Sequence, residues 1–399
     1  MKRIFALLLA CLLLAGTGPA AYAQEGPARD DEPPGWLRIK TKEEPRPGDD
    51  EIPDGSGSAP EEYVWSDYVA PSWLGIAPRE IPPQEEPEQP AEEESGFEIV
   101  VSFTGDMMLA SYKNETTASN FNAYANKNAP AYFLQNVKPI FEADDLTVVN
   151  LENVLTDRNL TERDKSETTA YWYRSRTANT EILTSSGVEA VSLANNHTGD
   201  YGDEGTKDTI KAVKAAGLLY GNNTETFYFE KNGYRIAVIC NGLWNEGQAG
   251  DIVRRIHQAE KDSDFQIVFY HGGKEKVHEP EEWRQRASRR LVDEGADLVI
   301  GNHPHVLQPR ETYNGVDIIY SMGNFCYGGS KYPENRTIIY QLKLRIDGEG
   351  KLESKTGEII PCYVYTGDAG NNYCPGIIGD EETKQKVLDF MDGKRNSPL

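Results

Sequence analysis

Short apolar runs rich in valine and isoleucine recur along the chain from residue 98 onward, and polar or amphipathic stretches separate them. Such runs predict buried strands, which we place at 98–104, 146–150, 188–193, 235–240, 265–270, 297–300 and 316–320. The stretches between them predict helices at about 129–142, 203–216, 251–262 and 281–294. Strands that alternate with helices are typical of an α/β domain with a parallel or mixed sheet.

The pattern changes toward the C-terminus. Residues 337–346 alternate between apolar and polar positions, and Asp347-Gly348 and another short run follow. This order predicts a β-hairpin, so part of the sheet should be antiparallel. The sequence contains no recognisable internal repeat, and we expect one folded domain over residues 98–399.

The first 23 residues have the pattern of a secretory signal peptide. Met1-Lys2-Arg3 is basic, residues 4–15 are apolar, and Ala21-Tyr22-Ala23 resembles a cleavage site. The apolar run is too short to span a membrane. We therefore expect cleavage after Ala23 and a protein that is secreted or held in the cell envelope. Lipidation at Cys11 is an alternative.

Residues 24–97 are rich in proline, glutamate, aspartate and glycine, which predicts a disordered acidic linker. Between Glu25 and Glu98, 21 acidic residues stand against 6 basic ones, a balance of −15 within a net charge of −23. Such a chain should not bind nucleic acid, because it would repel the phosphate backbone. Whether the segment is a stalk or a plain leader stays open.

Side chains that can bind metal ions follow five of the apolar runs. They are Asp106, Glu152, Asn196 with His197, His271, and His303 with His305. In an open α/β sheet, ligands bind beyond the carboxyl ends of the strands. Taken alone, Asp106 would be interpreted as a turn residue and Glu152 as a solvated charge. The hypothesis of a metal site therefore rests on the position that these residues share, at the ends of predicted strands. Carboxylate, amide and imidazole groups suit one or two divalent ions of Mn, Fe, Zn or Mg.

Four cysteines would remain after signal cleavage: Cys240, Cys326, Cys362 and Cys374. An exported protein can form disulfides. Cys362 and Cys374 are close in sequence and flank a turn-rich stretch, so they form the favoured pair. Four unpaired, partly buried thiols are an equal alternative.

Several motifs occur in an order that resembles the CapA family, whose members are linked to poly-γ-glutamate capsule synthesis and export in bacteria. These motifs are Gly105-Asp106-Met107-Met108-Leu109, Asn150-Leu151-Glu152, Ala194-Asn195-Asn196-His197, Asp200-Tyr201-Gly202, His271, Gly301-Asn302-His303-Pro304-His305 and Ser321-Met322-Gly323-Asn324. The resemblance covers residues 98–345. The family is similar in fold to calcineurin-like metallophosphatases, which implies a layered α/β/β/α sandwich with mixed sheets.

The resemblance also implies a role for each motif residue. Asp106, Glu152, Asn196, His271, His303 and His305 would hold the metal, with Glu152 in the place of the bridging carboxylate. His197 would contact substrate or donate a proton, and Asp200 would orient it. Asn195, Glu275 and Asn324 are expected to contact substrate at the rim of the site.

Two positions depart from the family pattern. Met108 stands where metallophosphatases have a ligand histidine, and Gly272 stands where the family has tryptophan after the histidine that matches His271. The loss of a ligand histidine at Met108 favours a non-catalytic module, whereas the presence of His197 and Asp200 favours an enzyme.

Three hypotheses therefore stand. The first is an exported metal-dependent hydrolase in polymer synthesis, and the second is an extracellular metallophosphatase or phosphodiesterase. The third is a non-catalytic polymer-binding or assembly module. The expected partners are an anionic polymer or a phosphate ester, and a membrane-bound polymer-synthase complex.

Overall fold

The computed structural model describes residues 96–166, 170–328 and 335–399. The expected signal peptide at 1–23 and all but the last two residues of the expected linker at 24–97 lie outside this part. Within the described residues, none of the helices has the length and apolar character that a membrane span requires.

Seven strands form the first sheet, in the order β16-β15-β14-β1-β3-β6-β7. Their bounds are β1 Phe97–Met107, β3 Leu146–Leu151, β6 Ala190–Ser192, β7 Leu219–Gly221, β14 Arg336–Ile346, β15 Leu352–Tyr363 and β16 Gly376–Ile377. Strand β1 runs parallel to β3 but antiparallel to β14. The antiparallel pair β14–β15 is the hairpin expected from the sequence, and it makes the sheet mixed.

The second sheet has six strands in the order β12-β13-β11-β10-β9-β8. Their bounds are β8 Thr226–Lys231, β9 Tyr234–Gly242, β10 Phe265–His271, β11 Leu298–Asn302, β12 Leu307–Tyr313 and β13 Val316–Met322. The four central strands are parallel, and β8 and β12 pair antiparallel at the two edges. The central strands are apolar on both faces because both faces are covered.

A hydrophobic core joins the inner faces of the two sheets. The rings of Phe103 on β1 and Phe269 on β10 lie 5.6 Å apart across it. Side chains of α7 (Glu381–Met391), which lies beside β12 and β15, also join this core. The two sheets therefore pack face to face.

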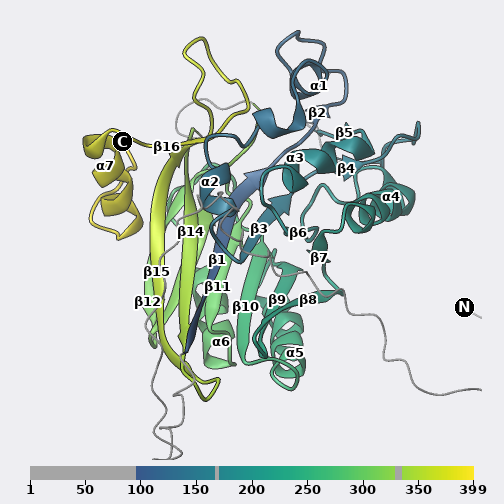
Figure 1. Ribbon diagram of the computed structural model, residues 1–399. Coiled ribbons are helices and arrows are strands. Elements are labelled where there is room, and N and C mark those ends of the chain that lie inside the picture. Colours follow the sequence, from purple (N-terminus) through teal and green to yellow (C-terminus); the bar gives the residue numbers. More distant parts are fainter. Residues whose placement is uncertain (1–95, 167–169, 329–334) are drawn as a thin grey trace, which may run out of the picture. The chain divides into compact units, whose positions relative to one another are not determined.

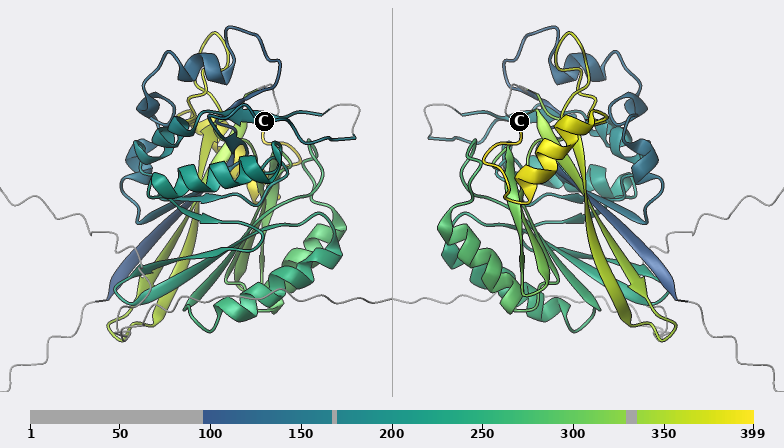
Figure 2. Two further views of the ribbon diagram at one scale, coloured as in Figure 1. Left: turned by 90° about the vertical axis from the view of Figure 1, so that its right-hand side faces the viewer. Right: turned by 90° about the vertical axis from the view of Figure 1, so that its left-hand side faces the viewer.

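Helices cover the outer face of each sheet (Figures 1 and 2). A second core joins the first sheet to α1 (Phe121–Ala125), α2 (Lys138–Phe141), α3 (Thr180–Thr184) and α4 (Gly202–Ala215). A third core joins the second sheet to α5 (Ala249–Ala259) and α6 (Glu282–Asp293). The expected layered α/β/β/α sandwich with mixed sheets is confirmed.

Three details of the fold were not expected. The predicted helix at 129–142 is wrong: the structure has only the 3₁₀ turn Pro130–Tyr132 and the four-residue α2. Proline lacks an N–H and fits only the first turn of a helix, so Pro130 and Pro139 each begin a new turn. A small third sheet of β2 (Ser111–Tyr112), β5 (Tyr173–Ser175) and β4 (Val154–Leu155) is also present. Further 3₁₀ turns occupy Thr177–Asn179 and Glu246–Gln248.

The favoured disulfide between Cys362 and Cys374 is absent. All four described cysteines are free and buried. Burial raises the pKa of the Cys362 thiol to about 12, because a thiolate is poorly solvated there. The alternative of four unpaired thiols is the one that the structure has.

Candidate metal centre and adjoining pocket

The carboxyl ends of strands from both sheets meet at one site. Asp106 lies near the end of β1, where it pairs with Asn150 of the neighbouring β3. His271 ends β10 and pairs with Asn302 at the end of β11. Asp106 also forms an isolated bridge with Asn324, which follows β13 of the second sheet. The candidate ligand side chains therefore converge because the strands that carry them end together.

Six side chains with possible ligand atoms form two groups that share Glu152. The first group is Glu152, His271 and His303, and the second is Asp106, Glu152 and His305, with the ligand atoms of each group within 4.8 Å of one another. Asn196 joins the first group, since its Oδ1 lies 2.8 Å from His271 Nε2. The structure thus brings together all six residues expected to hold metal, and their role as ligands stays a prediction.

Glu152 is a buried polar group of the site whose carboxylate has no hydrogen bonds within the described part of the chain. It is fully buried, and neither carboxylate oxygen has a hydrogen-bond partner among the described residues. Its Oε1 lies 3.4 Å from His271 Nε2, 3.9 Å from His305 Nε2 and 4.0 Å from His197 Nε2. A buried carboxylate without hydrogen-bond partners is costly. The donor set therefore fits a divalent cation, which would satisfy the carboxylate and the imidazole nitrogens together.

Asp106 is held by several neighbours. Its Oδ1 accepts a hydrogen bond from Asn150 Nδ2 at 2.8 Å, and its Oδ2 accepts one from the backbone N–H of His303 at 3.1 Å. His305 Nδ1 lies 3.2 Å from Oδ2. Asn150 itself is oriented by Asn195, whose Nδ2 donates to Asn150 Oδ1 at 3.1 Å. These bonds fix the orientation of the carboxylate before any ion binds.

Electrostatics in the site are dominated by the two buried carboxylates. Burial disfavours a charged imidazole at His271, but Glu152 and Asp106 outweigh it and raise the pKa of His271 to about 9. Against the same burial, the same carboxylates raise the pKa of His305 to about 10. Burial, together with His271 and His305, lowers the pKa of His303 to about 2. Without metal, two imidazolium ions would therefore balance Asp106 and Glu152 at neutral pH.

His197 lies beside the two groups and has its own partners. Its Nδ1 is 2.9 Å from Asp200 Oδ2, and its Nε2 faces Glu152. Asp200 is fully buried, forms an ion pair with Lys165 at 2.7 Å, and accepts a hydrogen bond from the backbone N–H of Tyr173 at 2.8 Å. The predicted pair of His197 and Asp200 is thus in contact, and it is held in one orientation from three sides.

The three expected substrate residues occupy different positions. Glu275 and Asn324 line the adjoining pocket. The side-chain amide of Asn195 makes hydrogen bonds within the protein. Its Nδ2 donates to Leu151 O at 2.9 Å, and its Oδ1 accepts from His197 N at 3.1 Å. Contact with substrate stays a prediction for all three, and Asn195 in addition braces the loop that carries His197.

The model of the bacterial capsule synthesis protein family PGA_cap matches residues 100–328 of the chain. The chain belongs to this family. The PGA biosynthesis protein CapA of Bacillus subtilis (strain 168) is 29% identical over 278 residues, which is 64% of this chain and 70% of that protein. The capsule biosynthesis protein CapA of Bacillus anthracis is 27% identical over 292 residues, or 66% and 68% of the two chains.

Among solved structures, a 5'-nucleotidase precursor from Thermus thermophilus has a TM-score of 0.40 and 13% sequence identity, over 66% of this chain and 54% of that one. The four-layer fold follows from the strand order and packing of the chain itself. The resemblance to the CapA family suggested by the motifs is confirmed by the family match.

Trp244 is a residue of this PGA_cap chain that the sequence reasoning missed. Its ring lies 4.9 Å from that of His303 and 5.7 Å from that of His271, at steep angles to both. At Gly272, a Cβ atom would lie only 1.8 Å from Leu243 O, so this backbone excludes a tryptophan there. Trp244 follows the end of β9. Its position just beyond a predicted strand is the feature of the sequence that could have identified it.

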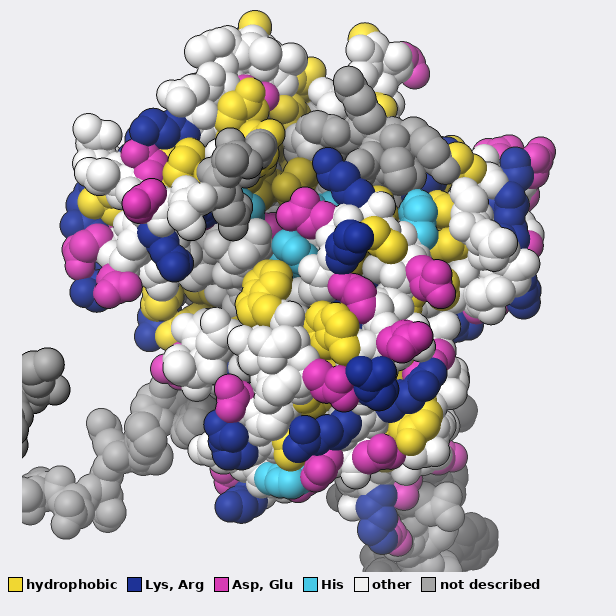
Figure 3. All heavy atoms as spheres, turned by 180° about the vertical axis from the view of Figure 1, so that it is seen from behind, with side chains coloured by type: hydrophobic (Ala, Val, Ile, Leu, Met, Phe, Trp, Pro, Cys, Tyr) yellow, Lys and Arg dark blue, Asp and Glu magenta, His cyan; other side chains and the backbone are white. Residues whose placement is uncertain are grey.

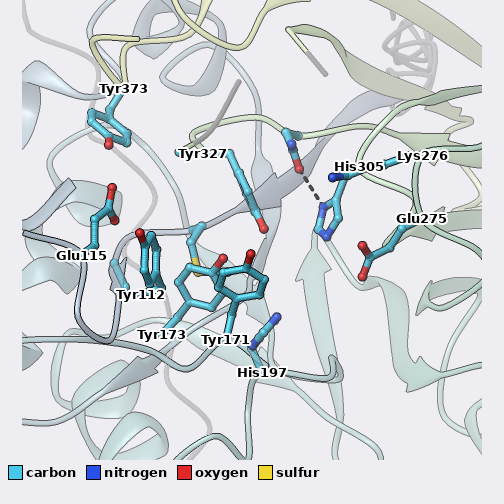
Figure 4. Close-up of a pocket in the computed structure, with 14 residues that line it drawn as sticks. Tyr112, Glu115, Tyr171, Tyr173, His197, Glu275, Lys276, His305, Tyr327 and Tyr373 are labelled. Carbon is cyan, nitrogen blue, oxygen red and sulfur yellow. Dashed lines mark hydrogen bonds between the residues drawn. The ribbon is translucent and has the colours of Figure 1, made fainter. Parts of the chain in front are cut away.

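A pocket of about 320 Å³ opens beside the two candidate ligand groups. His197 and His305 line it together with Met108 and five tyrosines, namely Tyr112, Tyr171, Tyr173, Tyr327 and Tyr373 (Figure 4). Burial, with Glu152 nearby, raises the pKa of Tyr327 well above its usual value, so it stays a neutral hydrogen-bond donor. Figure 3 shows histidine side chains reaching the surface on one face, with acidic and basic side chains around them.

The other two histidines lie apart from this site. His257 on α5 forms an ion pair with Glu294 at 3.2 Å, and His278 Nδ1 is 2.7 Å from Leu307 O. Neither belongs to the groups around Glu152. His257 therefore offers a control position for experiments on the site.

Proposed function

We propose that this PGA_cap protein is an exported component of poly-γ-glutamate synthesis or export, and that its site is a metal-dependent hydrolase centre. The relatives named above are capsule and polyglutamate biosynthesis proteins. The observation that carries the catalytic part is Glu152, a fully buried carboxylate without a hydrogen-bond partner among the described residues, which belongs to both ligand groups.

The residues present fit divalent metal ions. Glu152, His271, His303 and Asn196 would hold one ion, and Asp106, Glu152 and His305 would hold a second. Carboxylate, amide oxygen and imidazole suit Mn, Fe, Zn or Mg. When bound, such ions supply Lewis acidity at a carbonyl or phosphoryl oxygen and lower the pKa of water.

His197 is proposed as the proton donor to the leaving group. Its Nε2 faces the ligand groups and its ring lines the pocket, while Nδ1 is held by Asp200. A carboxylate that accepts from Nδ1 fixes the tautomer and stabilises the imidazolium form. Lys165 and the Tyr173 backbone hold Asp200 in turn, so the ring would stay aimed at the reacting bond.

A non-catalytic polymer-binding module is a second candidate, and Met108 is the observation that favours it. Met108 is 1% exposed and lines the pocket where a ligand imidazole is expected. The second ligand group consequently has three members instead of four. A binder would need the pocket but not the pair of His197 and Asp200.

The test is hydrolysis of a γ-linked polyglutamate by the full chain after loading with manganese or zinc. We expect new amine ends to appear, and we expect His197→Ala to slow their formation about 10²–10⁴-fold while the metal content is unchanged. His257→Ala is the matched control and should cleave as the wild type does. Binding of the polymer without cleavage by the wild type would support the binding module, and turnover of bis-p-nitrophenyl phosphate alone would support a phosphodiesterase.

Export is a separate part of the proposal, since the signal peptide lies outside the described residues. N-terminal sequencing of the protein recovered outside the cytoplasm should begin at Gln24. A cytoplasmic protein that retains Met1 would contradict export. Co-purification of membrane-bound polymer synthase with the exported protein would support the proposed partner complex.

A further inference from the structure

The pocket beside the ligand groups has a lysine in the lining that the structure describes. Among the described residues that line it, Lys276 is the only lysine or arginine, while Glu115 and Glu275 contribute negative charge. Lys276 has no ion pair or side-chain hydrogen bond within the described residues. Figure 4 shows its side chain extended alongside His305, with Glu275 on the other side of that ring. An unpaired cation at this position is available to a ligand.

The backbone of Lys276 is tied to the segment that carries two proposed metal ligands. Its N–H donates to Pro304 O at 2.8 Å. Lys276, His303 and His305 have φ angles of 60°, 98° and 59°, in the left-handed region that side chains other than glycine rarely adopt. Such backbone conformations are strained, and strain of this kind collects at functional sites. The loop therefore positions the lysine relative to the histidines.

A row of tyrosines leads away from His197 on the other side of the pocket. The ring of Tyr173 lies 4.8 Å from that of His197, Tyr171 stacks on Tyr173 at 6.3 Å, and Tyr112 meets Tyr171 edge-on at 5.5 Å. Aromatic faces pack on planar groups, and phenols donate hydrogen bonds to carbonyl oxygens. Such a row suits an extended, amide-linked chain better than a compact phosphate ester.

We propose that Lys276 is the specificity-determining residue of this site, and that its ammonium group binds a carboxylate of an amide-linked chain that lies along the tyrosine row. The inference rests on the proposed function and adds the group that distinguishes a carboxylate-bearing chain from a neutral one. In a protein with a net charge of −23, one exposed cation beside the ligand groups gives an anionic ligand a favourable contact at this place.

Binding is the direct test, with the manganese-loaded full chain and two fluorescent probes. The first probe is a γ-linked pentaglutamate, and the second is the same peptide with its free carboxylates converted to amides. We expect Lys276→Ala to weaken binding of the acidic peptide about tenfold, as the loss of one charge-assisted contact would. The amidated peptide should bind more weakly to the wild type and should be insensitive to this substitution. Lys276→Arg should retain most of the affinity.

Lys274→Ala is the matched control, because Lys274 is exposed on the same loop but does not line the pocket. It should leave both affinities unchanged. Equal binding of the acidic peptide by wild type and Lys276→Ala would overturn the proposal, and so would an equal loss in Lys274→Ala or no binding to the wild type. Cleavage of the bound peptide is scored separately. Binding that depends on Lys276 without cleavage would reject the hydrolase and leave this inference standing.

Discussion

The two ligand groups share Glu152 but are not equally complete. The first combines a carboxylate and two imidazoles with the Asn196 amide oxygen, which lies 2.8 Å from His271. The second has two carboxylates and one imidazole, and Met108 lines the pocket where a further imidazole is expected. Four ligands close a coordination shell more fully than three. For the proposed metal centre, we therefore predict one ion that binds tightly and one that binds weakly.

Protonation does not separate the two groups. His303 has a lowered pKa of about 2 and is ready to coordinate at neutral pH, but His271 of the same group has a raised pKa of about 9 and His305 of the second group one of about 10. Because metal and proton compete for the same nitrogen, each group must lose one proton before all of its imidazoles can coordinate. The expected inequality therefore rests on the composition of the groups.

Replacing Glu152 should have the largest effect, because it breaks both groups at once. We expect Glu152→Gln to lower the affinity for both ions by more than about a hundredfold and to bring cleavage to background. Elemental analysis after dialysis measures the ions directly. His257→Ala is the control, since His257 lies on α5 in an ion pair with Glu294 and belongs to none of the candidate ligand groups. Full metal content in Glu152→Gln would contradict the shared-ligand arrangement.

His197→Ala tests the part of the site that belongs to neither group. Loss of a general acid typically costs about 10²–10⁴ in rate, and we expect kcat to fall in that range. The metal content should stay as in the wild type, because the ligands of both groups remain. Asp200→Asn should cause a smaller fall. An unchanged kcat in His197→Ala would remove this residue from the mechanism.

Met108→His should reduce the inequality between the groups. The side chain is buried beside the second group and lines the same pocket as His305, so an imidazole there can add a fourth ligand. We expect the affinity for the weaker ion to rise about tenfold, measured by competition with a chelator. The tighter ion should be unaffected. If neither dissociation constant changes, Met108 is not the cause of the weaker binding at the second group.

Protonation gives a smaller, pH-dependent signal. At pH 7, His271 and His305 are charged in the metal-free protein, because their pKa values are about 9 and 10. Full loading should therefore release about two protons. Calorimetric titrations in buffers of different ionisation enthalpy measure this number. No release at pH 7 would contradict the charged state proposed for the two histidines.

The same shifts set the sign of a stability change. A histidine whose folded pKa is raised stabilises the folded state fully below the unfolded pKa of about 6.5, and that contribution is lost as the pH rises through the folded value. The metal-free protein should therefore lose stability between pH 7 and pH 10. Thermal unfolding should show a falling Tm over this range, and His271→Asn should flatten the fall. A Tm that rises over this range would contradict the raised pKa values of the two histidines.

The sequence predicted the parts of the fold that depend on local pattern. The buried strands at 98–104 and 265–270 correspond to β1 and β10, and the helices at 203–216 and 281–294 correspond to α4 and α6. Because the expected ligands follow such strands, their convergence could also be anticipated. The order of the motifs predicted the CapA resemblance, and the resemblance in turn implied the layered sandwich.

Features that depend on tertiary contact could not be predicted. The strands of the small third sheet have only two or three residues, too few to show a period. The tyrosine row comes from that sheet and from a loop near it, so its members are scattered in sequence. Lys165 reaches Asp200 from a polar stretch with no signal of its own. The lack of hydrogen bonds to the Glu152 carboxylate among the described residues appears only when all its neighbours are placed.

A stepwise metal titration tests the central claim most directly. Metal-free full-length protein is titrated with manganese or zinc, and the bound ions are counted by native mass spectrometry. We predict two ions that bind in unequal steps, with His271→Ala removing the tighter one and His305→Ala the weaker one. A protein that binds no ion, or that binds ions equally well in both variants, would contradict the account.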